Sequence, residues 1–535
     1  MSIHRIYKTD ADVTRAIFDQ VSHTRNNGQN RNLKVGLDYY LTKKTTLGIV
    51  ATGFSNNWRQ TGLNKSFLMN ADSKTDSIVE SGTNINNKWR NGSVNLNLRH
   101  SYDSTGRELT ADVDALVYDV TNDQMFTNTS FSPTMVKQFE DKLSGDLPMQ
   151  INIYSAKMDY THPLKNNSKV EAGWKSSYVI TDSKAKFYNV LGGESYPDYG
   201  KTNFFRYKEN INAAYINFNK KLSNKIELQT GLRFENTNYS GLQHGNPTRN
   251  DSSFKKSYNG LFPTVYMSYA VDSNNKVGFS IGRRIDRPRY EDLNPFQFFI
   301  DKYTYGRGNP YLKPQYTNNI EVNHNYKGFL TTTLNYSYTK NMFSEIFDQE
   351  GDYATVVTQG NIGKRQNAGV AVSVQISVAK WLNTNLYTNY NYSILEGKLV
   401  GEDFRVEGAN LLFNMNNQFN FQNGWSAELS GWARTKGIEG QIVTYPMGAL
   451  TTGVGKQVLK GKGTIRLTVR DIFYTQPAKG DINFKSTEAH FRSKWDSRNA
   501  NISFTYRFGK PLKGQAPQRR DRGPEEQNRI KGAGN

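Results

Sequence analysis

Residues 277–322 read VGFSIGRRIDRPRYEDLNPFQFFIDKYTYGRGNPYLKPQYTNNIEV, and this stretch decides the fold. In residues 277–282 apolar side chains alternate with small or polar ones, so an extended chain there has one apolar face and one small or polar face. Four prolines and two glycines end the alternation between Arg287 and Pro314, and Ile320 and Val322 resume it. The stretch predicts a strand, a long loop and a second strand, with the strands lying between hydrocarbon and water.

The same alternation recurs along the chain in segments of about ten residues, the length with which a tilted strand crosses a bilayer. The clearest segments are 33–39, 109–117, 370–378, 411–421 and 501–508. Nine short turns join such segments: TKKT (42–45), YDSTGRE (102–108), HPLKNNSK (162–169), KKLSNK (220–225), VDSNNK (271–276), YKG (326–328), AKW (379–381), FQNGW (421–425) and LKGKG (459–463). Two strands per turn and one final strand predict about 19 to 20 strands.

Connections on the opposite side are long and rich in polar residues, near 58–76, 123–148, 186–203, 240–256, 287–313, 343–364, 395–406, 436–448 and 475–497. Such one-sided loops separate a membrane barrel from a β-helix or a propeller, whose repeats are even. We therefore expect an all-β chain, a transmembrane antiparallel β-barrel. Its short turns would be periplasmic and its long connections extracellular.

Composition supports this class. The chain has 535 residues, a hydrophobic content of 36% and a mean hydropathy of -0.72, which suits several soluble domains, a repeat protein or a membrane barrel. A barrel is favoured because its lumen and loops are polar, and the 32 tyrosines and 29 phenylalanines suit its aromatic girdles. No apolar run approaches the roughly 20 residues of a transmembrane helix.

The net charge of +20 raises the question of a nucleic-acid partner. Lysines and arginines are, however, spread among acids in turns and loops, without a basic helix, zinc-finger spacing or RNA-binding sheet signature. We expect a solvated basic surface and no nucleic-acid partner. In an outer membrane this surface would face outer-membrane lipid and anionic lipopolysaccharide.

Three regions follow from the pattern. Residues 1–30 are predicted to be a polar N-terminal segment forming an extracellular loop, and residues 31–509 the barrel. Residues 510–535 carry seven Lys or Arg against three Asp or Glu, with prolines, and predict a disordered basic periplasmic tail.

Two motifs carry a family resemblance. GRRIDRPRYEDLNPF (282–296) followed by YTYGRGNPYLKPQYTNNIEV (303–322) resembles the segment shared by TonB-dependent outer-membrane receptors, especially the Bacteroidetes-type outer membrane β-barrel family. RSKWDSRNANISFTYRFG (492–509) is similar to that family's last hairpin. The resemblance implies a 22-stranded barrel in a Gram-negative outer membrane that imports a scarce small solute with energy from TonB. It also implies a plug, for which we see no room ahead of Leu33, so we expect the barrel portion only, linked to the TonB system through a plug outside this chain.

The motif also supplies candidate ligand-binding residues at the lumen and extracellular mouth: Arg284, Asp286, Arg287, Tyr290, Asp292, Asn294 and Tyr303. Guanidinium, carboxylate, amide and phenol groups together suit an anionic or hydroxylated ligand. The alternative is that Arg284 and Asp286 pair across the wall while Pro288 and Pro295 shape the loop. We favour this structural role, because residues shared by receptors with different ligands have structural roles more often than ligand-specific ones.

Aromatic side chains expected at the membrane interface are Trp381, Trp425, Trp432, Tyr506 and Phe508. The seven histidines are isolated and cysteine is absent, so we expect no enzyme, metal site or cofactor. The expected function is an outer-membrane receptor or transporter barrel for TonB-dependent uptake. The alternatives are a structural or adhesion barrel and a passive pore.

Overall fold

The wall of the protein consists almost entirely of strands. The computed structural model describes residues 1–8, 13–351, 354–399, 401–484, 487–509 and 524–530, and within these ranges 28 strands form one sheet. The strands are β1 Ser2–Lys8, β2 Thr14–Tyr40, β3 Thr45–Asn70, β4 Thr75–Ser101, β5 Glu108–Phe131, β6 Lys137–Asp146, β7 Met149–Leu164, β8 Ser168–Leu191, β9 Glu194–Pro197, β10 Asn203–Lys221, β11 Ile226–His244, β12 Ser252–Ala270, β13 Asn275–Asp286, β14 Gln297–Asp301, β15 Thr304–Arg307, β16 Gln315–Tyr326, β17 Leu330–Glu350, β18 Ala354–Ala379, β19 Leu382–Leu399, β20 Glu402–Asn420, β21 Trp425–Arg434, β22 Gly437–Glu439, β23 Ile442–Thr444, β24 Met447–Val458, β25 Gly463–Arg470, β26 Ala478–Phe484, β27 Thr487–Ser493 and β28 Asn499–Tyr506.

Four short 3-10 helices complete the described elements: η1 Glu291–Leu293, η2 Gln422–Gly424, η3 Leu459–Gly461 and η4 Glu525–Arg529. In the described part of the chain, no helix has the length and apolar character needed to cross a membrane.

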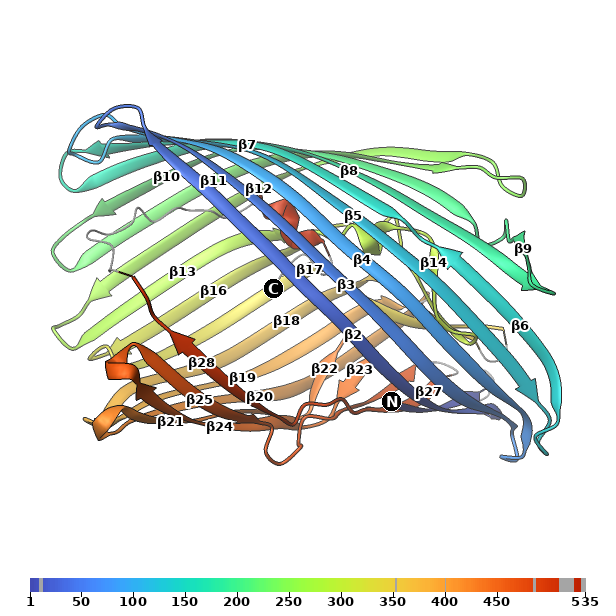
Figure 1. Cartoon of the computed structure of the whole chain (residues 1–535). Coiled ribbons are helices and arrows are strands. Elements are labelled where there is room, and N and C mark those ends of the chain that lie inside the picture. Colours follow the sequence, from blue (N-terminus) through green and yellow to red (C-terminus); the bar gives the residue numbers. More distant parts are fainter. Residues whose placement is uncertain (9–12, 352–353, 400, 485–486, 510–523, 531–535) are drawn as a thin grey trace.

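The structure confirms the all-β antiparallel fold, and each of the nine short turns lies where the sequence places it. β2 ends at Tyr40 and β3 begins at Thr45, for example, and β20 ends at Asn420 before β21 begins at Trp425. Figure 1 shows these turns gathered at one end of the ring of strands. Adjacent strands in the wall run antiparallel, as consecutive hairpins require.

The strands are longer than a bilayer requires. β2 has 27 residues, whereas about 9–11 suffice for one crossing. Exposed apolar side chains lie on the part of β2 next to its short turn, at Leu33, Val35 and Leu37. The rest of β2 extends beyond this apolar belt on the side away from the short turn. The predicted connection 58–76 is likewise mostly strand: it belongs to the β3–β4 hairpin, whose turn is residues 71–74. The extensions lack the pattern of a membrane strand, because their outer faces lie in water instead of hydrocarbon.

The N-terminal region differs from expectation for the same reason. Residues 1–30 were expected to be a loop, but the described part of this range forms β1 and the first part of β2. β1 pairs with β2 on one side and with β27 on the other. Backbone hydrogen bonds stabilise this hairpin, and on its inner face Tyr7, Ala16 and Phe18 are buried with Leu68 and Val79.

The wall closes through β1 in its extracellular half. From Ser22 to Tyr40, toward the short turns, β2 pairs with β3 alone among the residues that the structure describes. In the same part of the chain, β28 pairs with β25 alone. Figure 1 shows these two edges, blue and red, on the near side of the ring.

Two segments lie inside the ring. Residues 287–314, which we call the inward loop, run from β13 to β16 and contain η1, β14 and β15. The second is Pro524–Ile530, expected to belong to a disordered tail, which forms η4 within the lumen, while residues 510–523 and 531–535 lie outside the described residues (Figure 1). Side chains from the inward loop, from Ile530 and from the wall together form the largest buried apolar cluster.

Candidate functional site

Two glutamates on neighbouring strands mark the site. Exposed Ile216 on β10 and Phe234 on β11 belong to the outer face. Glu209 and Glu235 have the opposite parity, so they face the lumen, where both are buried. Buried carboxylates require ionic or hydrogen-bonding partners.

Arg287 is the ion-pair partner of the buried Glu235 carboxylate. Its Nη2 donates to Glu235 Oε2 at 2.6 Å and to Thr237 Oγ1 at 3.1 Å, and its Nε donates to Tyr258 Oη at 2.9 Å. The Arg287 side chain is only 12% exposed. The first residue of the inward loop is thereby fastened to the luminal wall by a charge-assisted network.

Tyr290 and Arg529 are the hydrogen-bond and ion-pair partners of Glu209. Tyr290 Oη donates to Glu209 Oε2 at 3.5 Å, and Arg529 forms an ion pair with the same carboxylate. The Arg529 guanidinium lies 4.2 Å from the centre of the Tyr290 ring, a cation–π contact. Burial raises the pKa of Tyr290 well above its ordinary value, against the opposing effect of Arg529, so the phenol stays protonated and can donate.

A second ion pair holds η4. Lys175 Nζ on β8 lies 3.0 Å from Glu526 Oε1, and the two side chains are 7% and 4% exposed. Ser177 Oγ donates to the same oxygen at 2.9 Å. The C-terminal segment thus contributes one acidic side chain, Glu526, and one basic side chain, Arg529. Each pairs with a luminal residue of opposite charge.

The inward loop is anchored around the bore. Gln20 on β2 donates to Asp301 at 2.9 Å, and Lys302 pairs with Asp141 on β6 at 2.6 Å. Phe299 packs edge-on against Phe187 of β8 with ring centres 5.5 Å apart. Residues of β15 pair in parallel with Thr355–Thr358 of β18. Because these anchors belong to well-separated parts of the wall, the loop spans the lumen rather than projecting outward.

The structure brings together only some of the predicted ligand-binding residues. Arg287 and Tyr290 meet around the two glutamates, as described above. Arg284 and Asp286 are exposed, and Asp286 accepts a hydrogen bond from Gln315 at 2.9 Å. Arg283, the neighbouring arginine, stacks instead on Tyr316, 5.0 Å from its ring centre.

Asp292, Asn294 and Tyr303 stabilise the inward loop itself. Asp292 pairs with Arg289 at 3.3 Å, and Asn294 Oδ1 accepts the Phe296 N–H at 3.2 Å. Tyr303 lies farther along the loop, where its ring contacts Phe18 of β2 edge-on. A role for any of them in binding a ligand remains a prediction.

Four of the predicted interface aromatics lie at the short-turn end. Trp381 is in the β18–β19 turn and Trp425 begins β21, and these indoles are 49% and 48% exposed. Tyr506 ends β28 and stacks with Phe508. Trp432 is seven residues beyond Trp425 on β21 and lines a hollow described below.

The sequence did not single out Glu209, Glu235, Lys175 or Arg529. Luminal residues of barrels are generally polar, so a charged side chain at luminal parity carries no special signal there. Arg529 lies in a segment whose composition indicates disorder. Among the described residues no group of three or more His, Asp or Glu side chains is placed to hold a metal ion.

An antiparallel ring of strands with an apolar outer belt, one-sided short turns and a loop folded into its lumen defines a transmembrane β-barrel of the receptor type. The family model described as outer membrane protein beta-barrel family matches residues 100–506. The chain therefore belongs to this family and resides in a Gram-negative outer membrane.

Solved structures share the fold. The ferric-catecholate import receptor Fiu from E. coli K12 matches with a TM-score of 0.55 at 12% identity, covering 95% of this chain and 81% of that one. The ferric yersiniabactin uptake receptor FyuA from Yersinia pestis gives 0.54 at 12%, covering 95% and 80%. The copper transporter OprC gives 0.53 at 12%, covering 89% and 80%. A search of curated proteins finds no significant match.

Proposed function

We propose that this chain forms the wall and mouth of a receptor for TonB-dependent uptake of a scarce small solute. The observation that carries the proposal is the inward loop, which crosses the bore and is fastened to β2, β6, β8 and β18. A passive pore needs an open lumen, whereas a receptor needs a closed one that presents binding groups at its mouth.

The family membership and the fold shared with uptake receptors support the same proposal. Two of the structural neighbours are named for ferric complexes and one for copper, so metal complexes are the first solutes to test. Coupling to TonB would pass through a plug seated in the barrel, as in other large transporter barrels.

Equilibrium binding tests the proposal. The purified chain in detergent would be titrated with radiolabelled ferric catecholate, ferric yersiniabactin and Cu²⁺. We expect saturable binding of at least one of these, weakened when Gln20→Ala and Lys302→Ala together release the loop from β2 and β6. A large stable conductance in planar bilayers without saturable binding of any solute would show a passive pore instead.

A further inference from the structure

The barrel wall has a hollow at one level, lined both by residues that face outward and by residues of the opposite parity, Arg434 among them. Phe413 on β20 lies opposite Ala433 on β21, which lies opposite Gly448 on β24. Directly paired residues share a face, and Phe413 is exposed together with Leu411 on the apolar belt, so this row faces outward. The next row consists of Met415, Gly431 and Leu450. The small residues leave a hollow between larger apolar side chains.

The hollow lies near the extracellular rim of the belt. Phe413 precedes Phe421, in the short turn, by eight positions, and a crossing takes about 9–11 residues. On the extracellular side of the hollow, neighbouring strands end and short connections follow. These connections are residues 435–436, 445–446 and 471–477. The segment 471–477 is held against β24, because Gly448 N donates to Thr475 O at 3.2 Å and Thr475 Oγ1 donates to Gly448 O at 2.9 Å.

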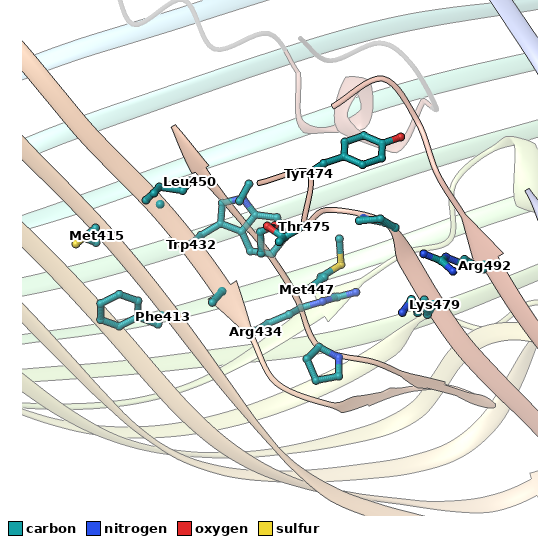
Figure 2. Close-up of a pocket in the computed structure, with 16 residues that line it drawn as sticks. Phe413, Met415, Trp432, Arg434, Met447, Leu450, Tyr474, Thr475, Lys479 and Arg492 are labelled. Atoms are coloured by element: carbon teal, nitrogen blue, oxygen red, sulfur yellow. The ribbon is translucent and has the colours of Figure 1, made fainter. Parts of the chain in front are cut away.

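Three cations line the upper side of this hollow. Lys479 on β26 and Arg492 on β27 are directly opposite each other, an arrangement of like charges that destabilises a sheet unless an anion compensates it. Arg434 extends from the end of β21 toward them, beside Met447 (Figure 2). Its Nε is buried and has no hydrogen-bond partner among the residues that the structure describes.

Acids within the described residues do not neutralise these cations. None of the three side chains forms an ion pair there, although both strands carry acids on the same face. Asp481 is bound by Tyr445 at 2.6 Å and by His490 at 2.7 Å, and Glu488 pairs with Lys8 at 3.3 Å. The hollow therefore combines an apolar floor at the membrane rim with unpaired positive charge directly above it.

We propose that this hollow binds a phosphorylated, acylated lipid of the outer leaflet, with its phosphate on Arg434, Lys479 and Arg492 and an acyl chain against Phe413, Met415 and Leu450. Guanidinium and ammonium groups bind phosphate through charge-assisted hydrogen bonds. The continuity of the apolar floor with the belt favours a lipid anchored in the membrane over a soluble phosphate.

Titration with purified lipid A tests the assignment. The full chain in detergent would be titrated with bisphosphorylated lipid A, with dephosphorylated lipid A and with inorganic phosphate, and bound lipid read by native mass spectrometry. We expect the triple variant Arg434→Gln, Lys479→Gln, Arg492→Gln to weaken lipid A binding about tenfold or more, since each lost charge-assisted contact costs up to about tenfold. Gly431→Leu, which fills the floor, should weaken binding while leaving the cations in place.

The matched control is Lys88→Gln, Arg90→Gln, which removes two exposed cations from the outer face of β4 above its own apolar residues. It should leave binding unchanged, and every variant should keep heat-modifiable mobility as evidence of a folded barrel. Equal loss in the control, or undiminished binding by a folded triple variant, would overturn the proposal. So would inorganic phosphate that displaces lipid A at equal concentration, because the site would then be a simple anion site.

Discussion

Arg287 shows how single residues organise the bore. Its guanidinium and the Glu235 carboxylate are 12% and 8% exposed, so each depends on the other for compensation of a buried charge. Arg233 also pairs with Glu235 at 2.5 Å and retains part of that compensation. The pair fixes the point at which the chain leaves the wall and enters the lumen.

Arg287→Ala should therefore destabilise the protein by about 3 kcal/mol, the lower end for breaking a buried ion pair, because Arg233 remains. Urea unfolding in lipid, followed by the heat-modifiable gel shift, measures this change in the free energy of unfolding. Arg289→Ala is the matched control: its side chain is 49% exposed, and loss of its pair with Asp292 should cost about 1 kcal/mol or less. Equal losses in the two variants would contradict the role of burial.

His490 provides a pH-dependent contact above the apolar belt. Hydrogen bonds that the His490 ring donates to the carboxylates of Asp481, at 2.7 Å, and Glu488, at 3.2 Å, raise the pKa of His490. Burial opposes ionisation of Asp481, but hydrogen bonds from Tyr445 and His490 lower its pKa overall. The imidazole is about half exposed, so its effect on stability is small.

We expect the pKa of His490 to exceed the ordinary value of about 6.5 and to fall toward it in Asp481→Asn. Because the folded-state pKa is raised, the stabilisation is fully present below about pH 6.5 and is lost as pH rises through the folded value. Histidine-selective NMR in micelles, assigned with His490→Gln, measures both pKa values. An unchanged value in Asp481→Asn would exclude the carboxylate as the cause.

At the scale of elements, η4 is held in the lumen by contacts with two wall strands and the inward loop. Glu526 pairs with Lys175 of β8, Arg529 pairs with Glu209 of β10, and Arg529 Nε donates to Pro288 O at 2.9 Å. An element seated in the bore on ion pairs reduces the cross-section available to ions.

Deletion of residues 524–535 should raise single-channel conductance in planar bilayers, because the lumen loses this element. Glu526→Lys should act in the same direction through repulsion from Lys175, and the exchange Lys175→Glu, Glu526→Lys should restore the original conductance.

Glu525→Lys serves as the control, because the Glu525 side chain is 74% exposed even though it also reaches Lys175. It should change conductance less than Glu526→Lys. If the deletion and the reversal at Glu526 both leave conductance unaltered, η4 does not obstruct the bore.

At the scale of the molecule, the wall is a long antiparallel sheet with two edges in its lower half. Each residue of β28 from Asn499 to Tyr506 is exposed, and within the described part of the chain its ladder runs to β25 only. β19, by contrast, has ladders to both β18 and β20. Edge amides without a partner are open to solvent and to other strands.

Hydrogen exchange in detergent should therefore be faster for amides of β28 than for those of β19, because about half of the β28 amides lack a ladder partner. Mass spectrometry of peptic fragments measures both. Equal protection of the two strands would show that the edge is covered in solution, for example by a second copy of the chain.

The wall was predictable from the sequence because its signal is local. Residues 370–378 alternate between lipid and lumen, and turns such as AKW at 379–381 interrupt the pattern wherever the chain reverses. The extensions above the belt were not predictable as strands, because their outer faces lie in water instead of hydrocarbon and lack a run of apolar residues. Residues 1–30 are the clearest case, since Tyr7 and Phe18 are buried against residues distant in the chain, among them Leu68, Val79 and Tyr303.

For residues 277–322, the sequence by itself determined a strand, a break in the alternation and a second strand, because hydrocarbon and water impose a period of two on neighbouring residues. Only the tertiary structure decided that the break folds into the bore. That choice depends on partners distant in the chain, Glu235 for Arg287 at a separation of 52 residues and Glu209 for Arg529 at 320. No local pattern encodes such pairings, because the energy of a buried charge depends on which group of opposite sign the closed barrel brings to it.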